Sequence, residues 1–386
     1  MARAFYIGNG DAGQAFVKDS PAYGKVEVKE ARKGIAIYEV GETELGLTPK
    51  GELQLDFKVG WLARHPRNGM LYGCGGGRAQ AFAVAADGQL SLASSADTIP
   101  MGNGAFLELS RCGRWALVAN YSNGVVCVLP ILEDGSLGEA TDSKLHGGVP
   151  LSPALADRQE CCHPHQVRLD PAAERWALVC DLGADRVWVY AFDAAAGALS
   201  GAANSSRHLR LPEGAGPRHL DFHPGGRWVY VLCELDGNLV VCDWSAQEGR
   251  LTVKQSLYAL PDGMACCRAH HAGNSHVLAS ADGRNVYAST RTDNHIVVFR
   301  VDEGTGRVSK VQAVPCGGVC PRNFHLDYSG GRGVLRVGNQ DSQNVTEFRI
   351  QSSDGTLIEP GTVTCLPGMC PNVLPLPFSL TKSQKI

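Results

Sequence analysis

Glu234 is the first residue of this sequence whose position calls for a chemical explanation. It follows the apolar run Val229–Cys233, and a turn signal at Asp236–Asn238 comes directly after it. A carboxylate at the end of a buried strand has to be solvated, paired with a cation or used in chemistry. The simplest interpretation is a salt bridge between Glu234 and Arg218 at the edge of the fold.

Three more side chains with useful chemistry stand at the ends of apolar, strand-like segments. His165 and Arg218 stand near the starts of two such segments, and Arg291 ends a third. An imidazole or a carboxylate can accept and return a proton, whereas forked arginine donors bind phosphate, carboxylate or a developing oxyanion. Together with Glu234, this set predicts acid–base chemistry on a small anionic substrate, provided that the fold brings the four side chains together.

The fold that must position them is repetitive. Six similar units begin at Gly60, Asn103, His163, Pro217, Asn274 and Pro321. Each unit contains a short strand, a Pro/Gly turn, a strand rich in β-branched or aromatic residues, a second turn, a third strand and an xxGxL segment. Four short strands per unit, repeated radially, predict an all-β fold, a β-propeller.

The two ends of the chain supply a seventh blade. FYIGNG, KGIAIYEV and GELQLDF near the N-terminus resemble the second, third and fourth strands of a unit, and PNVLPLPFS (371–379) follows the sixth unit in phase. Joining these ends would close the ring and remove its free edges. We therefore expect residues 1–386 to form a single seven-bladed propeller, with Asp11–Arg32 as a polar loop inside the joint blade.

Strand direction places the polar side chains on one rim of this ring. In each blade the innermost strand starts beside the end of its antiparallel neighbour, so residues at these two points share a rim. The opposite rim receives ordinary turns such as HPGGR and YSGGR. Besides the four residues above, the polar rim receives candidate substrate-binding residues: Arg322, Asn323, Asn339 and Gln340. A concave mouth with convergent polar groups predicts a ligand site.

Composition narrows the class of partner. The formal net charge is -3 and no basic block occurs, which argues against nucleic acid and anionic membranes as partners. The N-terminus has no apolar signal segment and no run of 18 apolar residues occurs, so we expect a cytoplasmic protein without a membrane span. The sequence sets no oligomeric state.

The 14 cysteines are expected to be mostly reduced in such a protein. The segment CCHPH (161–165) could suggest zinc, but no second Cys/His group stands at zinc-finger or zinc-ribbon spacing. We therefore expect neither a metal nor another cofactor, and interpret Cys161 and Cys162 as packing residues.

Three segments, GAGPRHLDFHPGGRWVYVLCELDGN, HPHQVRLDPAAERWALVCDLGADRVWVY and NQDSQNV, resemble the lactonase family of seven-bladed propellers. That family includes propeller-type 6-phosphogluconolactonases and the fungal 3-carboxy-cis,cis-muconate lactonizing enzyme. The resemblance covers essentially the whole chain and implies His165, Arg218, Glu234 and Arg291 as catalytic residues. The chain departs from the family pattern in its longer N-terminal insertion and at Arg336-Val337-Gly338, which replaces a smoother apolar run.

Taken with the resemblance, the residues favour hydrolysis of a small anionic sugar lactone of the pentose phosphate pathway, with Glu234 or His165 as the base. The amides Asn323, Asn339 and Gln340 suit sugar hydroxyls, which a carboxymuconate lacks. A muconate cycloisomerase is the alternative enzyme, since arginines would also anchor carboxylates. A non-catalytic, protein-binding propeller is the alternative from another class.

Overall fold

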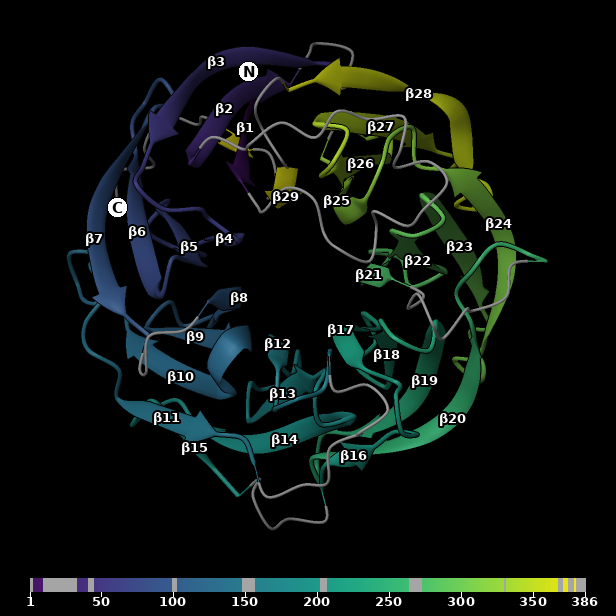
Figure 1. The fold of residues 1–386 in the computed structure, drawn as a ribbon, viewed down its shortest axis with the longest axis horizontal. Coiled ribbons are helices and arrows are strands. Elements are labelled where there is room, and N and C mark those ends of the chain that lie inside the picture. Colours follow the sequence, from purple (N-terminus) through teal and green to yellow (C-terminus); the bar gives the residue numbers. More distant parts are fainter. Residues whose placement is uncertain are drawn as a thin grey trace.

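The computed structural model describes residues 3–9, 33–40, 45–98, 103–147, 157–201, 207–263, 273–329, 331–366, 371–373 and 378–379. These residues form seven antiparallel sheets arranged around a central axis, as Figure 1 shows. The predicted seven-bladed propeller is therefore confirmed. The described residues contain no α-helix; their one helical turn is the 3₁₀ segment η2 (Tyr121–Asn123).

Six blades are continuous in sequence, and we number them 2 to 7 in chain order. Blade 2 contains β4 (Trp61–Arg64), β5 (Leu71–Gly75), β6 (Arg78–Val84) and β7 (Leu90–Asp97). Blade 3 contains β8 (Gly104–Leu109), β9 (Trp115–Asn120), β10 (Val125–Pro130) and β11 (Asp142–Leu145). Blade 4 contains β12 (Pro164–Leu169), β13 (Trp176–Asp181), β14 (Arg186–Asp193) and, both paired with β14, β15 (Ala198–Ser200) and β16 (Leu209–Arg210).

The remaining three continuous blades follow the same order. Blade 5 contains β17 (Pro217–Phe222), β18 (Trp228–Cys233), β19 (Asn238–Ser245) and β20 (Arg250–Tyr258). Blade 6 contains β21 (Asn274–Ala279), β22 (Asn285–Thr290), β23 (His295–Val301) and β24 (Val308–Pro315). Blade 7 contains β25 (Pro321–Asp327), β26 (Val334–Asn339), β27 (Asn344–Ile350) and β28 (Leu357–Cys365). All six begin within one residue of the predicted repeat starts.

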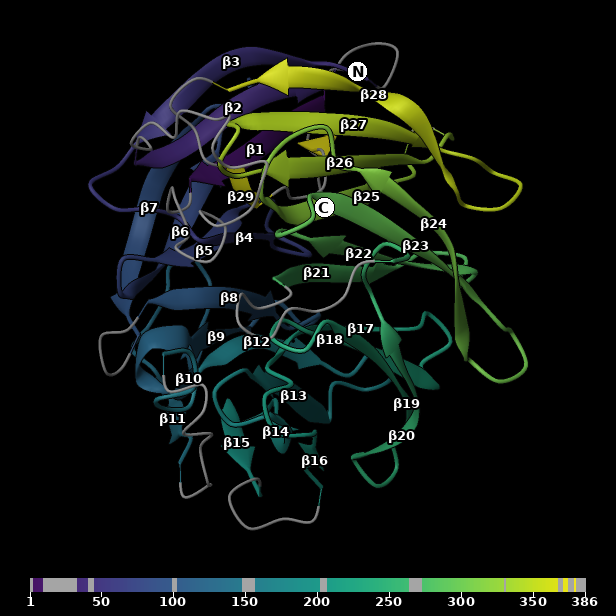
Figure 2. The ribbon, with the colours of Figure 1, turned by 45° about the vertical axis from the view of Figure 1, so that its right-hand side comes forward.

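Blade 1 joins the two ends of the chain. β1 (Arg3–Asn9), β2 (Gly34–Val40) and β3 (Leu47–Gln54) pair in order, and β29 (Pro371–Val373) and β30 (Phe378–Ser379) pair with the other edge of β1. In Figures 1 and 2 the purple strands β1 to β3 stand beside the yellow-green strands of blade 7. β3 starts earlier than the predicted strand GELQLDF and ends at Gln54. The predicted loop Asp11–Arg32 lies outside the described residues.

Apolar packing between neighbouring blades forms the core. The second strands β9, β13, β18, β22 and β26 are buried along their whole length, which explains their near-continuous apolar sequences. One cluster packs Trp176, Leu178 and Cys180 of blade 4 against Leu220, Val229 and Val231 of blade 5. No disulfide joins any cysteine in the part of the chain that the structure describes.

A tryptophan at the start of the second strand packs against a turn glycine of the next blade. An ideal Cβ built on that glycine would lie 2.1 to 2.6 Å from the ring, in the pairs Trp115–Gly197, Trp176–Gly249 and Trp228–Gly306. The indole Nε1 of Trp115 also donates to Ala194 O at 2.8 Å. The tryptophan that begins the second strand and the turn glycine before the fourth strand of the next blade are therefore two halves of one contact between blades.

Replacing Gly306 by alanine is expected to destabilise the ring more than the same change at Gly263. Both glycines have positive φ, +72° and +81°, so alanine is strained at either position. The new Cβ would lie 2.2 Å from Trp228 at position 306, whereas nothing lies within 4 Å at position 263. Overpacking of this kind costs about 1–3 kcal/mol. Urea unfolding of both variants measures the difference, and equal stabilities would contradict the role of the tryptophan contact.

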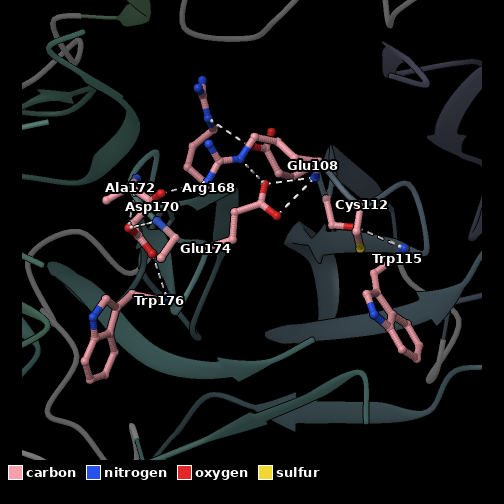
Figure 3. A network of polar contacts seen from close by, with 11 residues as sticks. Glu108, Cys112, Trp115, Arg168, Asp170, Ala172, Glu174 and Trp176 are labelled. Carbon is pink, nitrogen blue, oxygen red and sulfur yellow. Dashed lines mark hydrogen bonds and ion pairs between the residues drawn. The ribbon is translucent and has the colours of Figure 1, made fainter. Parts of the chain in front are cut away.

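A partly buried ionic network ties blades 3, 4 and 5 together on the side away from the polar rim. Arg168 of β12 lies 3.3 Å from Glu108 of β8 and 3.3 Å from Asp221 of β17, and Figure 3 shows the contact with Glu108. Burial raises the pKa of both carboxyl groups, and Arg168 opposes that shift. The network therefore joins the inner strands of three blades at the ends opposite to the polar rim.

Arg336, where the sequence departs from the family pattern, is satisfied by two acids. Its guanidinium lies 2.7 Å from Asp327 and 2.8 Å from Glu347, and it stacks over Phe5 of blade 1 at 5.5 Å. Glu347 also accepts a hydrogen bond from Gly46 N. This buried arginine and its partner Glu347 therefore link blade 7 to the joint blade at Phe5 of β1 and at Gly46 before β3, which explains a charged residue in an otherwise apolar strand.

Candidate active site

The strand pairing confirms that the first strand of a blade starts on the same rim on which the second strand ends. The first strand of each of blades 4 to 7 begins beside the end of the second, in the pairs Pro164↔Asp181, Pro217↔Cys233, Asn274↔Thr290 and Pro321↔Asn339. In blades 3 to 7 the register also shifts at this point. Bulges re-aim side chains and are frequent beside active sites. Here they fall on or beside His165, Arg218, Ser275 and Arg322.

Glu234 lies at the centre of three guanidinium groups. Its Oε2 is 2.9 Å from Arg218 Nε and 2.9 Å from Arg291 Nη2, and its Oε1 pairs with Arg158 Nη2. Two of these arginines are anchored further, because Arg218 donates to Ser275 O and Arg291 Nε donates to Gly273 O at 2.9 Å. The Glu234 carboxylate is therefore paired, and with three cations rather than one.

The electrostatics follow from this geometry. Burial by itself would raise the pKa of Glu234, but Arg291, Arg158 and Arg218 hold the pKa well below its usual range. An efficient general base has a pKa near the working pH. Glu234 therefore has the properties of a fixed anion that orients arginines, and is poorly suited to take up a proton.

His165 has the properties that Glu234 lacks. Its side chain is buried, and burial together with Arg218 lowers the pKa of the imidazole well below its usual value. The ring is therefore neutral at pH 7 and able to accept a proton. Its Nδ1 has no hydrogen-bond partner in the protein, and a buried, unpartnered nitrogen of this kind is explained by a water or a ligand atom. The ring lies edge-on to Tyr121 at 5.4 Å and to His219 at 5.2 Å.

Arg218 also fixes the tautomers of two further histidines. Arginine only donates, so the 3.2 Å contact of Arg218 Nη1 with His219 Nε2 makes that nitrogen the acceptor. His219 then carries its proton on Nδ1 and donates it to His276 Nδ1, 2.7 Å away. Burial lowers the pKa of both rings, with Arg218 the next cause in each case. This neutral pair supports one face of Arg218.

The candidate substrate-binding residues separate into two groups. Arg322 lies close enough to act on the pKa of His165 and Arg218, and the buried Asn323 has an Oδ1 without a hydrogen-bond partner. By contrast, Asn339 Nδ2 donates to Thr346 Oγ1 at 3.0 Å and lies 3.4 Å from Cys316 O, and Gln340 Nε2 contacts Asp341 at 3.3 Å. The Asn339 amide nitrogen is therefore directed into blade 7, and the Gln340 amide nitrogen toward a carboxylate of the rim. The roles of both residues toward a substrate stay predictions.

Sequence reasoning missed two residues of the site. Arg158 precedes β12 in a connecting segment, so strand phasing could not place it, yet it pairs with Glu234. Tyr121, which directly follows β9 on this rim and was not among the predicted site residues, interacts with Arg158, and burial raises the pKa of its phenol. A buried amide, Asn274, also has neither Oδ1 nor Nδ2 partnered. The sequence signal for Asn274 was its place at the start of a strand where the neighbouring repeats have proline.

A cavity of about 210 Å³ lies elsewhere, on the opposite rim between blades 6 and 7. Asp282, Tyr287, Tyr328 and Asp354 are among its lining residues, and none of the eight predicted site residues borders it. No helix in the described part of the chain is long and apolar enough to span a bilayer.

The site can be compared with those of known proteins. The chain is 31% identical to a 6-phosphogluconolactonase of Bacillus subtilis over 252 residues, 65% of this chain and 67% of that protein. It is 31% identical to one of Erwinia tasmaniensis over 283 residues, 73% of this chain and 77% of that protein. The solved structure of a periplasmic gluconolactonase of Pseudomonas aeruginosa superposes with a TM-score of 0.81 at 26% identity, covering 97% and 98% of the two chains. The family model described as lactonase, 7-bladed beta-propeller, matches residues 23–368, and the chain therefore belongs to the seven-bladed β-propeller lactonases.

Proposed function

We propose that this protein is a lactone hydrolase of the 6-phosphogluconolactonase type, acting on a small anionic sugar lactone. The observation that carries the proposal is a buried, neutral imidazole, His165, beside an arginine cluster made of Arg158, Arg218, Arg291 and Arg322. Such a site offers both a proton acceptor and donors for negative charge. The relatives named 6-phosphogluconolactonase support this reaction class.

The charge of the site favours an anionic substrate. Three guanidinium groups contact Glu234, and Arg322 lies near enough to act on the pKa of Arg218. The buried carboxylates Asp181 and Asp341 lie on the same rim, where Asp181 pairs with His146. The four arginines outnumber the one carboxylate that they surround, which leaves positive charge for a bound anion. A phosphate monoester carries about -1.5 to -2 at neutral pH, and planar arginine forks match its oxygens.

The geometry supports a direct hydrolysis. His165 accepts a proton from a water molecule as the water oxygen forms a bond to the lactone carbonyl carbon. The carbonyl oxygen becomes an oxyanion, which an arginine of the cluster stabilises in a site with little water. When the carbonyl re-forms, the bond to the ring oxygen breaks, and the ring oxygen takes the proton back from His165. Glu234 keeps the arginines in place through all these steps.

An assay of purified protein tests the proposal. Hydrolysis of 6-phosphoglucono-lactone is followed against the spontaneous rate, with the unphosphorylated lactone and 3-carboxy-cis,cis-muconate as comparison substrates. We expect acceleration with the phosphorylated lactone and no cyclisation of the muconate. Cyclisation together with hydrolysis no faster than the spontaneous reaction would overturn the proposal in favour of a cycloisomerase. No turnover of either substrate would favour a non-catalytic propeller.

Replacing Arg158 by methionine is expected to weaken binding of the phosphorylated lactone. Methionine keeps much of the side-chain volume but removes one positive charge and one forked donor, and a lost charged hydrogen bond costs about 1.5–3 kcal/mol. The KM for the phosphorylated lactone should rise roughly 10- to 150-fold, which is this free energy expressed as a ratio. The KM for the unphosphorylated lactone should rise less. Arg111→Met, in the turn between β8 and β9 on the opposite rim, is the matched control. Equal losses with both lactones would show that Arg158 does not recognise the phosphate.

A further inference from the structure

Glu160, Cys161 and His163 form a compact cluster of Lewis bases in the segment that leads into β12. One ligand atom from each of the three residues lies within 4.8 Å of the other two. His163 Nε2 is 3.1 Å from Glu160 Oε1 and 3.7 Å from Cys161 Sγ. His163 is buried, Cys161 is half-buried and Glu160 is exposed, so the cluster opens to solvent on one side.

The tautomer of His163 makes this cluster chemically unusual. Its Nδ1 lies 2.8 Å from the carbonyl oxygen of Tyr121, and a carbonyl cannot donate, so Nδ1 must carry the proton of that hydrogen bond. In a neutral ring Nε2 then carries a lone pair and lies 3.1 Å from a carboxylate oxygen, while the sulfur of Cys161 lies beside the ring, 3.7 Å from Nε2 and 3.8 Å from Nδ1. The imidazole nitrogen and the carboxylate oxygen carry no proton in this state, so a proton or a metal ion must lie between them. The candidates are the thiol proton of Cys161, a proton on Nε2 or a metal ion.

We propose that the Glu160–Cys161–His163 cluster binds a divalent transition metal ion, with zinc as the best match. Zinc takes mixed N, S and O ligands in tetrahedral geometry, with bonds of about 2.0–2.1 Å to nitrogen, 2.3 Å to sulfur and 2.0–2.2 Å to oxygen. Around a tetrahedral ion those bonds separate N from O by roughly 3.3 Å and N from S by roughly 3.5 Å. The observed N–O distance of 3.1 Å lies within a few tenths of an ångström of the first value. The sulfur, 3.7 Å from Nε2 and 3.8 Å from Nδ1, reaches the ion after a rotation of the Cys161 side chain.

The Tyr121 carbonyl contact completes the arrangement. A metal-binding histidine usually donates its other ring N–H to a carbonyl or carboxylate, which fixes the ring and its tautomer. Tyr121 also stacks on His163 at 4.3 Å, and the same tyrosine interacts with Arg158 of the arginine cluster. Three protein ligands leave a fourth position open. The proposed hydrolysis needs no such ion, so the metal site stands independently of it.

Sequence reasoning disfavoured zinc at this place because it counted only Cys and His ligands. Glu160 supplies the third donor, and the backbone of Tyr121 from blade 3 supplies the orienting acceptor. Neither contribution belongs to a Cys/His spacing pattern, and the second is 42 residues away in the chain.

The test is metal binding to the intact, metal-stripped protein. Zinc is titrated by calorimetry, and cobalt(II) replaces it as a spectroscopic probe, because a cysteine ligand gives a thiolate-to-cobalt charge-transfer band in the near ultraviolet. We expect one zinc per chain and that band. Cys161→Ser should abolish the band, and Glu160→Gln should weaken zinc binding about 10- to 100-fold, as lost metal-site contacts do.

Cys365→Ser removes an exposed thiol elsewhere and is the matched control, with unchanged binding expected. Neither Cys161→Ser nor Glu160→Gln removes an apolar core side chain, so both variants should fold. The proposal is overturned if zinc binding is absent, or if it persists unchanged in both cluster variants. It is also overturned if NMR of the imidazole nitrogens shows His163 doubly protonated at neutral pH and unaffected by zinc, because a proton would then be the cation of the cluster.

Discussion

Replacement of His165 by glutamine is expected to lower kcat about 10²- to 10⁴-fold, the usual contribution of a general acid–base group. Glutamine fills similar space and keeps hydrogen-bonding capacity, but it cannot accept a proton at working pH. Because His165 is neutral and buried, its loss removes no charge pair, and the free energy of unfolding should change little. Steady-state kinetics and urea unfolding of the same preparation measure the two quantities.

The pH dependence gives a second readout for His165. Burial and Arg218 lower the pKa of its imidazole below the ordinary value of 6.5, so the base stays unprotonated as the pH falls through 6.5. The wild-type kcat should therefore hold through that value and decline only at lower pH, and this acid limb should disappear in His165→Gln. His223→Gln, in the turn between β17 and β18 on the opposite rim, is the control. Normal turnover by His165→Gln would place the base elsewhere.

Glu234→Gln is expected to destabilise the fold by about 3–5 kcal/mol, the cost of removing one partner from a buried ion pair. The amide would leave Arg158, Arg218 and Arg291 facing one another without the anion that now contacts all three. Activity should fall as well, mainly because the arginines no longer hold their positions. Urea unfolding at pH 7 measures the stability, and Glu248→Gln, which breaks an exposed pair with Arg250, should cost only about 0–1 kcal/mol.

Added phosphate distinguishes this role of Glu234 from a role as base. If the carboxylate mainly holds the arginines, a bound anion can replace its charge, and inorganic phosphate should stabilise Glu234→Gln more than the wild type. If the carboxylate takes the proton in the reaction, the variant should keep its stability and lose kcat alone, without rescue by phosphate. The second outcome would reverse the assignment made here to His165.

Local patterns were enough to predict the fold. Each strand and turn of the repeat is encoded within about 50 residues, and six copies of a pattern reinforce one another. The starts of β12, β17, β21 and β25 coincide with the predicted units to within one residue. Strand direction alone then determined that His165, Arg218, Glu234 and Arg291 share a rim, because an antiparallel neighbour must end where its partner begins.

The sequence alone could not predict which of these side chains meet across blades. Arg158 and Glu234 are 76 residues apart, and Arg218 reaches Ser275 over 57. Propeller blades pack by surfaces that no local period describes, so the number of arginines on Glu234 appeared only in the tertiary structure. That number decides the chemistry: one arginine would leave Glu234 a possible base, whereas three hold it ionised and leave the proton to His165. Arg158 and Glu160 lie in the segment before β12. Strand patterns could not place this segment, because its position depends on packing between blades and not on the repeat.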